Sequence, residues 1–142
     1  MKIFILSLGC AKNRVDSECL AGELRRAGHT LTGSAEEAEA AIVNTCGFIQ
    51  PAVEENITAI LDLEELKAEG QLKKIGVIGC LFNRYGAELV AGFKTVDFWA
   101  ESEAWDKVLE ALGKLCLGLV FIKIIQIKNT DYVIDAVVVY RN

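Results

Sequence analysis

Short apolar runs alternate with longer segments of helical periodicity along the first 112 residues of the chain. The runs have the length and composition of buried strands and lie at 3–8, 29–31, 41–45, 75–78 and 96–99. Alternation of this kind is typical of parallel strands that are joined by helical crossovers. The sequence therefore predicts an α/β fold with a doubly wound, mostly parallel five-stranded sheet, for which we expect the flavodoxin-like strand order 2-1-3-4-5.

Residues that favour helix starts and ends mark the segments between these strands. The first predicted helix, 14–28, carries Val15 and Leu20 on its apolar face and ends at Gly28. The second begins at Pro51 and ends at Gly70, with an apolar face of Val53, Ile57, Ile60 and Leu61 and with Glu54 and Glu55 near its positive end. Two more helices are predicted at 83–90 and at 102–112, the latter capped by Ser102, and a turn of helix at 34–39.

Residues 1–113 are predicted to form one domain, and residues 114–142 an atypical apolar tail. The tail is dense in β-branched residues around a turn at 129–131, which predicts a hairpin. Two interpretations remain open for it. The hairpin adds strands to the edge of the sheet, or it pairs with a second copy and produces a homodimer.

Size and charge exclude several classes of protein. A chain of 142 residues buries a sufficient core without disulfides, so its five cysteines are available for chemistry. Its net charge of −5 has the wrong sign for a phosphate-binding surface, so we expect no direct contact with nucleic acid. The apolar run at 3–8 is too short for a signal peptide, and lysines interrupt the most apolar stretch. We therefore expect no membrane association and a cytoplasmic location, where thiols stay reduced.

Three cysteines follow three of the predicted strands, each at a point where a helix is expected to begin. Cys10 follows the first strand, Cys46 the third and Cys80 the fourth, and a glycine adjoins each of them. In the expected strand order these strands are neighbours, and ligands of such sheets bind outside the carboxyl ends of the strands. The positive ends of the following helices would favour thiolates there. The sequence therefore predicts a metal or iron–sulfur site formed by Cys10, Cys46 and Cys80.

Other roles are open to the cysteines. Cys19 and Cys116 are interpreted as ordinary small apolar residues. A structural zinc ion needs four ligands, and His29 is a poor fourth ligand, because we expect it to be a surface or loop residue at the opposite edge of the sheet. A disulfide switch stays open, although C-x-x-C spacing is absent. Three thiolates without a fourth would leave one iron of a four-iron cluster open to an outside ligand.

Five polar residues flank the cysteines: Asn13, Asp16, Asn44, Thr45 and Arg84. They could shape a pocket, or they could cap helices and make hydrogen bonds within loops. We favour the second interpretation.

Three blocks of sequence, 7–18, 43–49 and 79–85, resemble the amino-terminal domain of radical-SAM methylthiotransferases. The resemblance extends from residue 1 to about 112. Residues 47–49 and 84–85 are similar to the branch that modifies an aspartate of a small-subunit ribosomal protein, with the tRNA-modifying branch as the alternative.

The resemblance implies that Cys10, Cys46 and Cys80 bind an auxiliary [4Fe-4S] cluster whose open iron holds the sulfur or methylsulfur to be transferred. It also implies a second cluster, on a C-x3-C-x2-C motif, that cleaves S-adenosylmethionine, and a ribosomal protein as the substrate of the full-length enzyme. Neither that motif nor the family's carboxyl-terminal barrel occurs in this sequence. We expect the chain alone to be inactive, and a truncation or an altered reading frame near Lys114.

A second class of function is a flavodoxin-like binding module in which the thiols are merely structural. The sequence contains no G-x-G-x-x-G or phosphate-loop motif that would favour it.

Overall fold

The computed structural model describes residues 1–113, so the predicted hairpin and dimer contact of residues 114–142 lie outside the described residues. The described elements are β1 (Lys2–Ser7), α1 (Ala11–Arg26), β2 (Thr30–Thr32), β3 (Ala40–Thr45), α2 (Gln50–Ala68), β4 (Lys74–Gly79), α3 (Cys80–Gly92), β5 (Phe98–Ala100) and α4 (Trp105–Ala111). The five strands are all parallel and lie in the order β2-β1-β3-β4-β5. The predicted fold class and strand order are thus confirmed.

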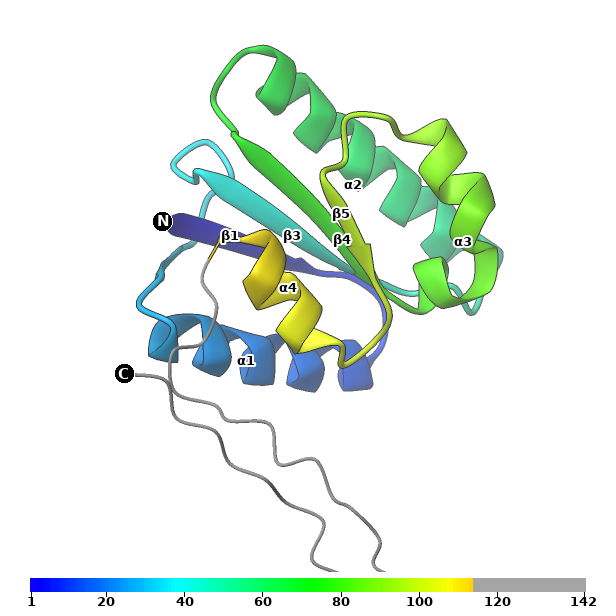
Figure 1. Ribbon diagram of the computed structural model, residues 1–142. Coiled ribbons are helices and arrows are strands. Elements are labelled where there is room, and N and C mark those ends of the chain that lie inside the picture. The colour runs from blue at the N-terminus through cyan, green and yellow to red at the C-terminus, as the bar shows by residue number, and fades with distance from the viewer. Residues whose placement is uncertain (114–142) are drawn as a thin grey trace, which may run out of the picture.

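Helices cover both faces of the sheet (Figure 1): α1 and α4 lie on one face, α2 and α3 on the other. Successive residues of β3 enter the two cores in turn. Ile42 packs in a cluster with Leu24 of α1, whereas Val43 packs in a second cluster with Ile60 of α2. Every residue of β3 is buried, which explains its continuous apolar run. No helix within residues 1–113 has the length and apolar character that crossing a membrane requires.

The exposed face of α1 differs from the prediction. Val15 is 56% exposed and not part of the core. The buried stripe of α1 consists instead of Asn13, Ser17, Leu20 and Leu24, whose spacings of four, three and four residues follow one helix face. The polar residues Asn13 and Ser17 occupy buried positions that the spacing of apolar residues does not reveal. Val15 lies outside this buried stripe.

Three smaller predictions were also wrong, for Leu61, residues 34–39 and Ser102. Leu61 is 47% exposed, because Ile60 and Leu63 take the buried positions of that part of α2. His29, predicted to be a surface or loop residue, lies in the loop between α1 and β2 and is buried there. Residues 34–39 form no helix, since so short a segment cannot offset the entropy of helix nucleation. Ser102 does not cap α4, which begins after Ala104 and has no side-chain cap.

Glu39, directly before β3, links the amino ends of β1, β3 and β4 through hydrogen bonds. Its carboxylate accepts hydrogen bonds from Lys73 Nζ at 2.7 Å and from the Lys2 backbone N–H at 3.0 Å. The bond from Lys73, followed by that from Lys2, holds the pKa of the Glu39 carboxyl below its ordinary value. A lowered carboxyl pKa contributes stability that is present above the unfolded-state pKa and is lost as the pH falls through the folded-state pKa.

We therefore expect Glu39→Gln to reduce the loss of stability between pH 6 and pH 3 relative to the parent chain. The measurement is the urea midpoint as a function of pH. Glu110→Gln, at an exposed position of α4, is the matched control and should leave the pH profile unchanged. Parallel profiles for the parent and Glu39→Gln would contradict this role.

Candidate functional site

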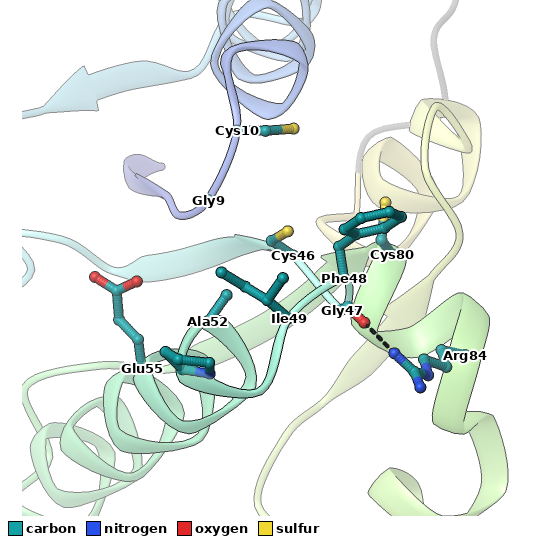
Figure 2. Close-up of a pocket in the computed structure, with 11 residues that line it drawn as sticks. Gly9, Cys10, Cys46, Gly47, Phe48, Ile49, Ala52, Glu55, Cys80 and Arg84 are labelled. Carbon is teal, nitrogen blue, oxygen red and sulfur yellow. Dashed lines mark hydrogen bonds between the residues drawn. The ribbon is translucent and has the colours of Figure 1, made fainter.

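The three predicted cysteines lie at the carboxyl ends of three adjacent strands. Cys10 is the N-cap residue of α1, Cys46 directly follows β3, and Cys80 is the first residue of α3 directly after β4. All three line one cavity of about 780 Å³. Figure 2 shows Cys10 on the loop that leads into α1, opposite the loops that carry Cys46 and Cys80. The structure thus brings together residues that are far apart in the sequence.

Apolar side chains form the rim of this cavity. Phe48 and Ile49, directly after the Cys46 loop, are 87% and 57% exposed, whereas Cys46 itself is only 7% exposed. Glu55 and Arg84 are the charged residues of the lining (Figure 2). The Cys46 thiol lies below these apolar groups, which screen it from solvent. An apolar shell of this kind controls the access of solvent to a metal site and thereby its redox potential.

Three helices begin at the cavity with their N-terminal backbone groups uncapped. No side chain caps α1, α2 or α3, and no acidic residue lies in the first turn of any of them. The predicted placement of Glu54 and Glu55 at the positive end of α2 was wrong, because α2 begins at Gln50 and both fall beyond its first turn. Uncapped N–H groups and helix dipoles favour a negatively charged ligand. The helix ends and Arg84 therefore favour negative charge in the cavity, and the Glu55 carboxylate opposes it.

Glycines let the cysteine loops touch one another. A Cβ on Gly9 would lie 2.2 Å from Cys46 Cβ, and Gly9 has φ +93°. A Cβ on Gly47 would lie 2.9 Å from the carbonyl oxygen of Cys80. These distances are too short for any side chain, so the glycine beside one cysteine makes room for the loop of the next.

Buried asparagines fix the same loops. The Asn56 amide donates to the carbonyl of Cys46 at 2.5 Å and accepts from the Cys46 N–H at 3.5 Å. Asn13 donates to the carbonyl of Leu8 at 2.8 Å, and Asn44 donates to the carbonyl of Asn13 at 2.9 Å. Each of the three asparagines is at most 3% exposed. The positions of Cys10 and Cys46 are therefore set by buried hydrogen bonds.

Sequence reasoning missed Asn56. The signal was present, because Asn56 lies three residues after Val53 and four before Ile60, on the buried stripe of α2. An amide at a core position needs partners for both its groups, and here the Cys46 backbone supplies them.

The polar residues that flank the cysteines divide between the two interpretations. Asn13, Asn44 and Thr45 make structural hydrogen bonds, as preferred, but they lie in α1 and β3 and not in loops. The Thr45 hydroxyl donates to the carbonyl of Ile78 in β4 at 2.6 Å. Asp16 instead pairs with Lys12 on the surface of α1. Arg84 does both, because it lines the cavity and donates from Nη1 to the carbonyl of Gly47 at 2.8 Å (Figure 2).

Within residues 1–113, no three His, Cys, Asp or Glu side chains meet closely enough to hold one metal ion. The thiolates of an iron–sulfur cluster bind separate irons, so they need to face one cavity but not to meet at a point. His29 lies at the amino end of β2, away from the carboxyl-end cavity. A cavity with three thiols and three positive helix ends suits an anionic cluster, and the metal site of Cys10, Cys46 and Cys80 stays a prediction.

Comparison with known proteins gives one matching family and many relatives. Residues 2–101 match the family described as "Uncharacterized protein family UPF0004". The chain is 48% identical over 118 residues to the ribosomal protein uS12 methylthiotransferase RimO of Desulfotalea psychrophila, which covers 83% of this chain and 26% of that protein. It is 53% identical over 97 residues to RimO of Heliobacterium modesticaldum, covering 68% of this chain and 21% of that protein. The chain thus spans about a quarter of the length of these relatives.

Solved structures of similar shape include one glycosidase. The CMP N-glycosidase BcmB of Clostridium botulinum has a TM-score of 0.47 and 15% identity, covering 79% of this chain and 97% of that one. A likeness of this degree carries no argument about function.

Proposed function

Because the chain belongs to the UPF0004 family, we propose that it is the amino-terminal cluster-binding domain of a methylthiotransferase. The proposed enzyme transfers a methylthio group to an aspartate of a small-subunit ribosomal protein. Eight relatives at 43–53% identity are named for ribosomal protein uS12, which favours this substrate over tRNA. The observation that carries the proposal is that Cys10, Cys46 and Cys80 line one cavity.

In this proposal the three cysteines hold a [4Fe-4S] cluster. When bound, the cluster would supply an iron with an open coordination position for a sulfur species. The helix ends of α1, α2 and α3 stabilise negative charge in the cavity, and Asn56 fixes the backbone of Cys46. Phe48 and Ile49 limit the access of water to the buried Cys46 thiol, whereas Cys10 is exposed and Cys80 partly buried.

The remaining parts of the reaction are proposed to lie outside this sequence. Cleavage of S-adenosylmethionine needs a second cluster, for which the sequence has no C-x3-C-x2-C motif. We therefore propose that the chain alone carries the cluster but does not catalyse the transfer. The proposed setting is the cytoplasm, with the ribosomal protein bound by a full-length enzyme and without direct contact with nucleic acid.

Anaerobic reconstitution with iron and sulfide tests this proposal. We expect the parent chain to gain a visible charge-transfer band, and the triple variant Cys10→Ala, Cys46→Ala, Cys80→Ala to show none, because the ligands are gone. Cys19→Ala is the matched control: Cys19 is an exposed cysteine of α1 outside the cavity, so this variant should keep the band.

A parent chain that takes up no iron would count against the proposal. If flavin then raised its melting temperature without iron, the binding-module alternative would replace the cluster-binding one.

A further inference from the structure

The loop between β5 and α4 reaches the cysteine site although it carries no cysteine. Ser102 Oγ lies 3.8 Å from Cys80 Sγ, within hydrogen-bonding distance for sulfur. Either group can donate while Cys80 is a thiol. A thiolate has no proton to give, so the Ser102 hydroxyl is then the donor.

The backbone of this loop is strained next to Ser102. Glu103 has φ +68°, and it is the one non-glycine residue within residues 1–113 with a positive φ. A Cβ makes this left-handed conformation unfavourable, so it persists only where the surroundings enforce it. Backbone strain of this kind is concentrated at functional sites.

Contacts from two helices reach this loop. Lys12 Nζ of α1 lies 3.0 Å from Glu103 Oε1 and 2.6 Å from Asp16 Oδ2. Hydrogen bonds to Asp16 and then to Glu103 raise the pKa of Lys12, so its ammonium stays charged. On the other side, Asn83 Oδ1 of α3 accepts from the Ser102 N–H at 3.4 Å. The loop is therefore held from both sides, with its hydroxyl beside Cys80.

The sulfur atoms of Cys10 and Cys80 differ in their hydrogen-bond partners. Cys10 Sγ faces Asn13 Oδ1 at 3.9 Å, and this oxygen cannot donate to a thiolate. The orientation of the Asn13 amide is fixed because its nitrogen donates to the carbonyl of Leu8. Within residues 1–113, the hydrogen bond between a hydroxyl group and a cysteine of the site is that of Ser102 with Cys80.

We propose that Ser102 is a positioning residue that donates a hydrogen bond to the Cys80 sulfur and thereby raises the reduction potential of a cluster bound at the site. This inference rests on the proposed function. A hydrogen bond to a ligating sulfur draws electron density from it and stabilises the extra negative charge of the reduced form. Removal of the hydroxyl therefore makes reduction harder without removing a ligand.

Redox titration of the reconstituted 142-residue chain tests the inference. At the midpoint potential of the parent, we expect Ser102→Ala to show an about tenfold lower ratio of reduced to oxidised cluster, equivalent to about 59 mV for one electron. Ser102→Thr keeps a hydroxyl and should stay near the parent. Lys12→Met, which releases the loop from α1, should shift the potential in the same direction as Ser102→Ala but less.

The outcomes separate this inference from the proposed function. Equal iron content and equal potentials in the parent and Ser102→Ala overturn the role of Ser102 and leave the proposed function intact. Loss of the cluster from Ser102→Ala but not from Ser102→Thr also overturns it, because Ser102 would then be needed for holding the cluster. A parent that takes up no cluster overturns both.

Discussion

Gly79→Ala is expected to lower the free energy of unfolding by about 3 kcal/mol or more, the sum of backbone strain and overpacking. Gly79 has φ +103°, and a Cβ there would lie 2.6 Å from the backbone oxygen of Thr45 and 2.7 Å from Asn44 Oδ1. Neither neighbour can move freely, because Thr45 belongs to the central strand β3 and Asn44 is bonded to α1. The substitution therefore forces β3 and β4 apart beside Cys80.

Gly22→Ala is the matched control for this prediction. Gly22 lies inside α1, where an added Cβ would meet nothing within 4 Å. Alanine is favoured over glycine within a helix, so this variant should be more stable by about 0.5–1 kcal/mol. Urea denaturation of both variants measures the two effects. A Gly79→Ala midpoint equal to that of the parent would show that the β4–α3 junction does not need glycine.

Asn56→Ala is expected to cost about 2–4 kcal/mol of stability, because each buried polar group left without a partner costs about 1–3 kcal/mol. The variant removes both hydrogen bonds that the side chain makes with the Cys46 backbone. The buried N–H and C=O of Cys46 would lose these partners, and the higher helix propensity of alanine offsets only part of the loss. We also expect weaker uptake of iron, since the Cys46 loop loses its anchor.

Thr58→Ala is the control on the same helix. Thr58 is exposed, and its hydroxyl donates to the carbonyl of Glu54 within α2, so its loss should change stability by less than about 0.5 kcal/mol. Urea midpoints and iron content after reconstitution are the measurements. If Asn56→Ala matched Thr58→Ala in both, the Cys46 loop would be held by other contacts.

Much of the fold could be predicted because both faces of its sheet are covered. Strands buried on two sides appear as continuous apolar runs, and β3 and β4 were found within two residues of their ends. The strand order followed from the common doubly wound topology, which alone made neighbours of the three cysteine-bearing strands. The family was recognised from three motif blocks, and this resemblance is confirmed by the match of residues 2–101.

The rest could not be predicted, because apolar patterns do not show where buried polar groups lie. Asn13 and Ser17 occupy core positions of α1 and displace Val15 to the surface. Ser102 reads as a helix cap by its residue type, whereas its neighbour Glu103 adopts a left-handed conformation that no local pattern indicates. Such positions depend on contacts between distant segments, which only the assembled structure defines.

The three cysteine thiols lie at three separate strand–helix junctions, and this has a consequence for the stability of the domain. Cys10, Cys46 and Cys80 become neighbours only when β1, β3 and β4 have paired. A ligand that needs all three thiols therefore binds the paired sheet in preference to the unfolded chain, in which these residues are far apart. Such a ligand would stabilise the native state as a whole, so that release of the ligand and global unfolding are coupled.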